Sequence, residues 1–90
     1  MRAQDSSRRI QMNSDKLNLL DTVVLLKSYL DHGLKAGDIG AIVELYEPDG
    51  VEVEFVTGSG KTQALLTLNR EDIRPIAADE ILAARSINAA

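Results

Sequence analysis

A chain of 90 residues, 44% of them hydrophobic, is long enough for one small domain and too short for two. It has no cysteine and only 3% aromatic residues, which excludes a disulfide framework or a thiolate metal site and predicts an aliphatic core. Residues 1–16 carry four Arg or Lys against two Asp (+2), whereas residues 17–90 carry six against twelve Asp or Glu (−6). This acidic folded part argues against nucleic-acid binding, because phosphate contacts require a basic patch.

Residues 1–16 are predicted to be an extension outside the folded domain. The arginines of this segment are not followed by an apolar stretch, so the segment is not a secretory signal. No stretch approaches the roughly 20 apolar residues that span a bilayer, so we expect no membrane partner and a cytoplasmic location.

Residues 13–21 are ambiguous between a short helical turn and a lead-in segment. Residues 22–26 are β-branched and apolar at nearly every position, which predicts a strand buried on both sides.

A β-hairpin centred on Pro48-Asp49-Gly50 is the unit around which the other elements are placed. Strand-type residues precede and follow this tripeptide. Pro48 and Asp49 suit the central positions of a type I turn, and Gly50 suits the left-handed residue after it. The resulting register places four apolar side chains on one face, with Leu45 opposite Val53 and Val43 opposite Phe55.

A second hairpin is predicted to turn at Ser59-Gly60, taken as a two-residue loop. Its register pairs Phe55 with Ala64, Val53 with Leu66 and Val51 with Leu68. Residues 69–72 are expected to form a short turn or a single 3₁₀ turn, followed by a last short strand over residues 73–76. Pro75 cannot donate a hydrogen bond to a sheet, so this strand lies at an edge or ends there. Asp79 is a candidate cap for a short helix over residues 80–87, which must pack against the domain or fray.

Five short strands joined by tight turns, with Gly40 as a bend point, predict a mainly β fold. The expected architecture is a small five-stranded SH3-like barrel over residues 17–76, with a short C-terminal helix or tail over residues 77–90. An open antiparallel sheet plus a helix is the alternative.

Five segments of the chain carry a family resemblance: Leu20–Leu25, Asp31–Leu34, Gly37–Glu44, Val51–Phe55 and Ala64–Leu68. They resemble a family of small bacterial proteins catalogued as domain of unknown function 4926, over about residues 17–76. The resemblance implies a compact, stand-alone cytoplasmic domain of SH3-like type, with no established catalytic residues. It also implies a role beside small toxin-like or nuclease-like partners, which suits an antitoxin or immunity protein.

No catalytic or cofactor-binding constellation is evident, so we predict a non-enzymatic protein that uses no cofactor and no metal. The segment Gly58–Thr62 is similar to the end of a phosphate-binding loop, but Phe55 stands where that motif needs its first glycine. His32 is the only histidine, so a catalytic triad or a histidine-rich metal site cannot be assembled around it. One set of carboxylates could converge: Asp21, Asp31, Asp38 and Glu44. Solvated or capping roles are commoner for such residues.

The sheet face opposite to the core is the predicted partner-binding surface. The register that buries Val43 and Leu45 sends a mixed set of side chains to this face: Ile42, Glu44, Tyr46, Glu52, Glu54, Val56 and Leu65. Glu44 is expected directly across from Glu54, and like charges so opposed are mildly destabilising. An apolar cluster bordered by acids has the composition of a docking surface for a basic partner. The alternative is that barrel closure, the lead-in segment or the C-terminal helix covers the apolar members.

The leading hypothesis is a non-enzymatic protein-binding module, either an antitoxin or an immunity partner of a basic toxin-like protein. Self-association would be another use of the same face. The alternative is an RNA- or ribosome-associated SH3-like module that uses the basic residues of segment 1–16 with Arg70 and Arg74.

Overall fold

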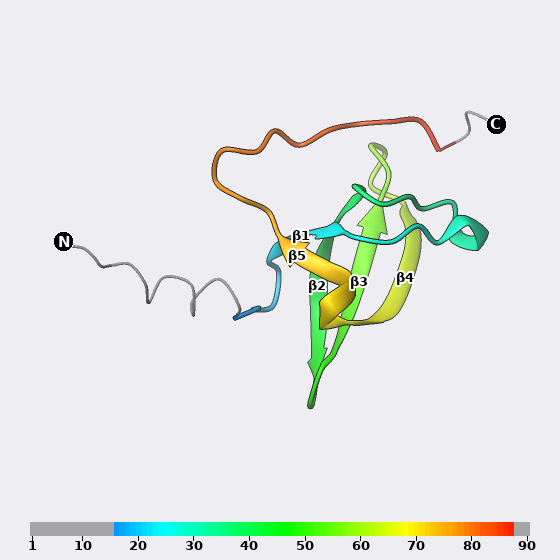
Figure 1. Ribbon diagram of the computed structural model, residues 1–90. Coiled ribbons are helices and arrows are strands. Elements are labelled where there is room, and N and C mark those ends of the chain that lie inside the picture. Colours follow the sequence, from blue (N-terminus) through cyan, green and yellow to red (C-terminus); the bar gives the residue numbers. More distant parts are fainter. Residues whose placement is uncertain (1–15, 88–90) are drawn as a thin grey trace.

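The fold is one antiparallel sheet of five strands. The computed structural model describes residues 16–87. In chain order its elements are β1 (Thr22–Leu25), η1 (Leu30–His32), β2 (Ile39–Tyr46), β3 (Gly50–Val56), β4 (Thr62–Asn69), η2 (Arg70–Asp72) and β5 (Ile73–Pro75). The strands lie in the order β4-β3-β2-β1-β5 (Figure 1). The mainly β prediction is confirmed. Residues 1–15 of the predicted extension lie outside the described residues.

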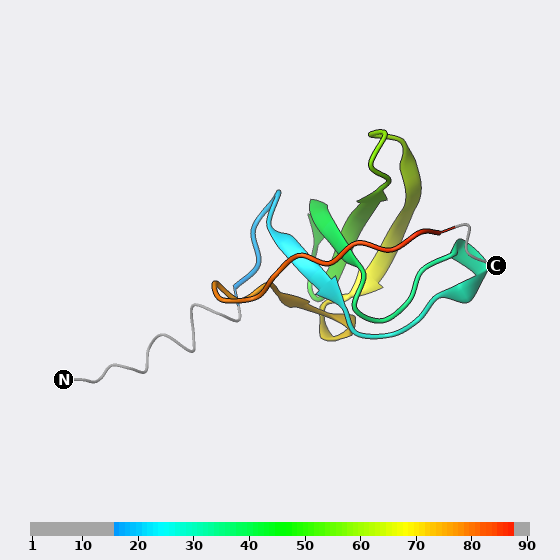
Figure 2. The ribbon, with the colours of Figure 1, turned by 90° about the horizontal axis from the view of Figure 1, so that it is seen from above.

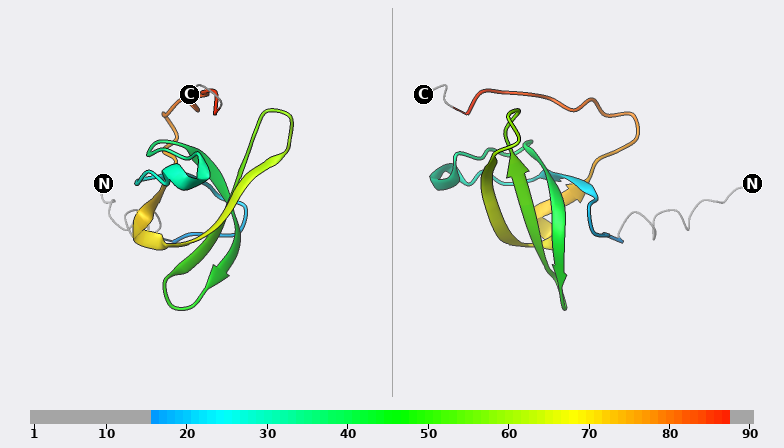
Figure 3. Two further views of the ribbon diagram at one scale, coloured as in Figure 1. Left: turned by 90° about the vertical axis from the view of Figure 1, so that its right-hand side faces the viewer. Right: turned by 180° about the vertical axis from the view of Figure 1, so that it is seen from behind.

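The sheet is open, with β4 and β5 as its two edges. These edge strands follow one another in the chain and are joined only by the three residues of η2, the predicted 3₁₀ turn. Because three residues span at most about 10 Å, the sheet has to curl until its edges approach each other; Figure 3 shows this curl. No pairing of β4 with β5 closes the described sheet, so the predicted closed barrel is not confirmed and the open-sheet alternative describes the strands correctly.

The β2–β3 hairpin has a different register from the predicted one. Tyr46 pairs with Gly50, so the loop is residues 47–49 and closes one residue earlier than expected. Leu45 then lies opposite Val51, and a bulge at Val43 shifts the register between residues 42 and 44. The predicted pairs Leu45–Val53 and Val43–Phe55 are therefore wrong. A side chain at Gly50 would meet the Tyr46 Cβ at 3.2 Å, which shows how closely the two strands approach at this turn.

The bulge reverses which residue of β2 enters the core. Ile42 pairs with Val53 and has no exposed surface, whereas Val43 is half-buried and Leu45 is exposed near the hairpin tip. A β-bulge adds one residue to one strand, so the side chains beyond it change face relative to a regular alternation.

The β3–β4 hairpin has the predicted central register. Its core-facing pairs are Val51–Leu68, Val53–Leu66 and Phe55–Ala64. At the loop, Gly60 N donates to Thr57 O at 2.8 Å and Thr57 N donates to Lys61 O at 2.9 Å, so three residues form the loop instead of two. Gly60 has a φ of +87°, the left-handed conformation that follows a type I turn in such loops. A register shift between Phe55 and Val56 absorbs the extra residue.

One core, aliphatic except for Phe55, fills the inside of the curl. It consists of Val23, Leu25, Leu34, Ile42, Val51, Val53, Phe55, Ala64, Leu66, Leu68 and Ile73. Val24 is also buried, which confirms that β1 is covered on both sides. Gly40 sits where β2 and β3 approach closely: a Cβ there would lie 2.7 Å from Val53 Cγ1 and 2.9 Å from the Glu54 carbonyl oxygen. Only glycine fits this position without a backbone shift.

The predicted C-terminal helix does not form in residues 77–87. A single turn closes where Glu80 N donates to Ala77 O at 3.1 Å, and the chain then runs without helix or strand. Ile81 and Leu82 are 90% and 62% exposed, so a helix here would have no apolar contact to stabilise it, and short helices are marginal alone. Figures 1 and 2 show this tail, in orange to red, lying over the sheet and running towards the loop that contains η1.

Candidate functional site

The candidate site is the outer face of the sheet, formed by β2, β3 and β4 on the side away from the core. Cross-strand pairing fixes its members, because residues directly opposite each other share a face. Glu44 pairs with Glu52, Glu52 with Thr67, and Glu54 with Leu65. The outer face consists of Glu44, Tyr46, Glu52, Glu54, Val56, Leu65 and Thr67.

Six of the seven predicted surface residues lie on this face, and Ile42 does not. Ile42 was expected beside Tyr46 at the surface, but its side chain is 0% exposed and belongs to the core. The cause is the bulge at Val43, which the alternation of side chains in the sequence does not reveal. The apolar part of the outer face is therefore reduced to Tyr46, Val56 and Leu65, each of which is exposed.

The carboxylates of the outer face are arranged differently from the prediction. Glu44 lies opposite Glu52, not Glu54. The Tyr46 hydroxyl donates a short hydrogen bond to Glu52 Oε1, and this bond to an anion is the main reason that the pKa of Tyr46 is raised. Glu54 accepts a 2.5 Å hydrogen bond from the Thr62 hydroxyl. Three acids thus remain on one face, two of them directly opposed.

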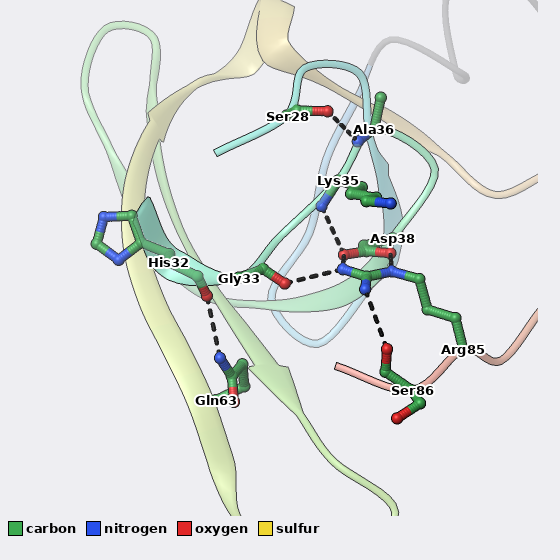
Figure 4. A network of polar contacts seen from close by, with 9 residues as sticks. All are labelled: Ser28, His32, Gly33, Lys35, Ala36, Asp38, Gln63, Arg85 and Ser86. Carbon is green, nitrogen blue, oxygen red and sulfur yellow. Dashed lines mark hydrogen bonds and ion pairs between the residues drawn. The ribbon is translucent and has the colours of Figure 1, made fainter. Parts of the chain in front are cut away.

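A second polar site lies where the tail crosses the loop before β2. The Arg85 guanidinium makes two contacts with the Asp38 carboxylate, Nε to Oδ1 at 2.8 Å and Nη2 to Oδ2 at 2.6 Å (Figure 4). Its Nη2 also donates to the Gly33 carbonyl at 2.8 Å. The hydrogen bond from Arg85 holds the pKa of Asp38 below its ordinary value, and the Lys35 backbone N–H, donating to the same carboxylate, adds to this effect.

Sequence reasoning missed this second site. Asp38 was considered only as a possible catalytic carboxylate, and Arg85 was placed on a helix that does not form. The two residues are 47 positions apart, and nothing in the local pattern around either one indicates the other. An alignment showing that the two positions vary together would have been the signal needed.

The other residues considered for catalysis do not converge. Asp21 accepts a hydrogen bond from Asn18 N at 2.9 Å and so closes the lead-in turn. The carbonyl of His32 accepts a hydrogen bond from the Gln63 side chain at 3.0 Å. Within residues 16–87, no group of three or more His, Cys, Asp or Glu side chains could hold a metal ion.

Of the basic residues of the RNA-binding alternative, Arg70 and Arg74 lie in η2 and β5, whereas Arg2, Arg8 and Arg9 lie outside the described residues. Arg74 makes a bidentate pair with Glu80, at 2.8 and 2.6 Å. This contact lowers the pKa of Glu80 to about 2, helped by the hydrogen bond that Glu80 accepts from Ala77 N. The charge of Arg74 is therefore already balanced within the chain, and phosphate binding would have to break this pair.

By its fold and these sites, the chain is a small antiparallel β domain with an acidic, partly apolar outer face. Within that class, the chain belongs to the family named domain of unknown function DUF4926, whose model matches residues 19–75. This confirms the predicted resemblance. No match to the chain is found among curated proteins or among solved structures. None of the helices in residues 16–87 has the length and apolar character needed to cross a membrane.

Proposed function

We propose that this chain is a non-enzymatic protein-binding module that docks a basic partner on its outer face. The observation that carries the proposal is the pairing of Glu44 with Glu52 beside the exposed side chains of Tyr46 and Leu65. Opposed carboxylates cost a sheet between a few tenths and about 1 kcal/mol, and exposed apolar side chains contribute little to a core. Folding alone gives no reason for this combination, whereas a basic, partly apolar partner surface would benefit from both parts.

The charge distribution supports the same partner chemistry. Residues 17–90 carry an excess of six acidic side chains. Such a field speeds the association of a positively charged protein and opposes that of a nucleic acid. The most specific form of the proposal is an antitoxin or immunity protein that covers a basic toxin-like protein in the cytoplasm. The curled five-stranded sheet supports the assignment of the domain to the SH3-like type.

The test is co-expression with the product of the adjacent gene and co-purification through a tag on that product. Leu65→Arg and Glu54→Lys each place a positive charge on the outer face and should reduce recovery of the complex at least tenfold. Glu71→Lys is the matched control, because it makes the same charge change at an exposed position of η2, away from the outer face. Thermal unfolding of each free variant checks that the domain remains folded.

Unchanged recovery with both outer-face variants, at unchanged thermal stability, would refute the surface assignment. Loss of recovery with Glu71→Lys as well would indicate a general charge effect in place of a defined site. Self-association through the outer face would appear as a concentration-dependent mass in light scattering that Leu65→Arg abolishes.

A further inference from the structure

The loop before β2 is built as a receptor for a guanidinium group. Asp38 Oδ2 accepts a hydrogen bond from Lys35 N at 2.8 Å, and Asp38 N donates to Lys35 O at 2.9 Å. The loop is braced further by the bond from Ala36 N to the Ser28 hydroxyl, at 3.0 Å (Figure 4). These contacts involve no residue of the tail. Gly33 N donates to Leu30 O at 3.0 Å. The Asp38 carboxylate and the Gly33 carbonyl thus belong to segments that the domain itself braces, and both are acceptors for one guanidinium.

An open groove of about 540 Å³ lies beside this receptor. The domain contributes an apolar wall that includes Leu34, Ile39, Phe55 and Val56. The tail contributes residues 83–87, of which two are alanines. Ile81 and Leu82, the large apolar residues just before this stretch, are not among the lining residues and stay exposed. Ile87 is the one large apolar side chain that the described tail presents to the groove, whereas the other lining residues of the tail have small or polar side chains, as at Ala83, Ala84 and Ser86.

Two ion pairs connect the tail to the domain. Arg85 is fixed to Asp38 and Gly33, and Glu80 is fixed to Arg74. The side chains of Arg85 and Asp38 are 33% and 17% exposed. Both pairs are in contact with water, so solvent and salt screen them and weaken their hold on the tail. Release of the tail breaks these pairs and would uncover both the carboxylate and the apolar wall.

We propose that this groove binds an extended, arginine-bearing segment of a partner protein, and that Arg85 occupies the arginine position until the partner displaces it. The partner segment would place its guanidinium on Asp38 and the Gly33 carbonyl, as Arg85 does. It would place larger apolar side chains in the groove where the tail has Ala83 and Ala84. Arginine is required because the two-point contact with a carboxylate matches its planar fork, which lysine lacks. The guanidinium receptor lies outside the outer face, since neither Asp38 nor Gly33 belongs to it, and Val56 of the groove wall is shared with that face.

Two variants free the tail but differ in the receptor. Arg85→Gln removes the competitor and leaves Asp38 intact, whereas Asp38→Asn removes the anionic receptor as well. The probe is an acetylated pentapeptide with the sequence of residues 83–87 in which both alanines are replaced by leucine. A second peptide also carries lysine in place of arginine. Binding is measured by amide chemical shifts in titrations of the full chain at low salt.

The arginine peptide should shift the amides of Gly33, Lys35 and Asp38 and bind Arg85→Gln about tenfold more tightly than the parent chain, because a tethered competitor acts at an effective concentration in the millimolar range. It should bind Asp38→Asn at least tenfold more weakly than Arg85→Gln, and the lysine peptide should lose several-fold on Arg85→Gln. Equal binding of the arginine peptide to Arg85→Gln and the parent would overturn the proposal, as would equal binding of the two peptides to Arg85→Gln.

If Asp38→Asn fails to fold, which its own spectrum reveals, the lysine peptide still decides whether the site selects a guanidinium. Sedimentation of the parent chain tests the remaining occupant. A dimer that forms with increasing concentration and is lost in Arg85→Gln would assign the groove to the tail of a second copy and would overturn the proposal of a different partner protein.

Discussion

The reversal of Ile42 and Val43 gives the sharpest test of the sheet register. Ile42→Ala removes three carbon groups from a fully buried site. Each buried methylene contributes about 0.8 kcal/mol to the free energy of unfolding, and the cavity left behind adds a further cost. We therefore expect a loss of about 3–4 kcal/mol in the free energy of unfolding. Val43→Ala acts at the half-buried bulge and should cost about 1 kcal/mol or less.

Urea unfolding followed by circular dichroism measures both changes, with the slope m checked for constancy. In a domain of this size, 1 kcal/mol corresponds to about 4–8 °C in Tm, so Ile42→Ala should lower Tm by more than 10 °C. Leu65→Ala serves as the control, since Leu65 is 52% exposed on the outer face and should change stability by less than about 1 kcal/mol. A larger loss for Val43→Ala than for Ile42→Ala would refute the observed register and restore the regular alternation.

Three further predictions concern β2 and the tail. Gly40→Ala should destabilise the fold by about 1–3 kcal/mol in urea unfolding, because its Cβ would meet the Glu54 carbonyl at 2.9 Å, whereas Gly58→Ala, with nothing within 4 Å, should be near neutral. Glu44→Gln should stabilise the domain by a few tenths of a kcal/mol at low salt, and a gain that persists unchanged in 1 M salt would contradict the electrostatic explanation. The folded-state pKa of Glu80 is lowered from 4.5 to about 2, so the contact with Arg74 contributes above pH 4.5 and is lost as the pH falls towards 2. Carboxyl shifts in NMR should follow this window, and a midpoint near 4.5 would show that the contact does not form.

The sequence was sufficient where side-chain alternation was regular. The β3–β4 pairing follows from matching apolar residues on two strands, and the structure has the same pairs. It was insufficient where an extra residue entered a strand, as at Val43, because a bulge changes the face of a side chain without changing composition. The helix predicted over residues 80–87 was wrong for another reason. The segment suits a helix locally, but a helix of this length depends on tertiary contacts, and Ile81 and Leu82 make none.

Six of the seven residues predicted for the outer face lie on it, even though the predicted register of the β2–β3 hairpin was wrong. The predicted register and the observed one differ by two positions at Leu45, and a shift by an even number keeps every side chain on its face. Glu44 and Tyr46 therefore stayed outside, whereas Ile42, on the other side of the bulge, changed from the outer face to the core. The predicted pair of opposed acids was Glu44–Glu54 and the observed pair is Glu44–Glu52, so Glu44 still lies opposite an acid, but a different one.

The outer face and the groove meet at the end of β3, where Val56 belongs to both. While the tail lies on the groove, Arg85 balances the charge of Asp38. Displacing the tail would expose that carboxylate at the groove of a domain whose outer face already presents three acids, and would move a positive charge away. A partner carrying both a basic surface and an arginine segment would thus meet a more negative surface once the tail has left. Because the two contacts would favour each other only through this charge, their coupling should weaken with salt even where each apolar contact persists.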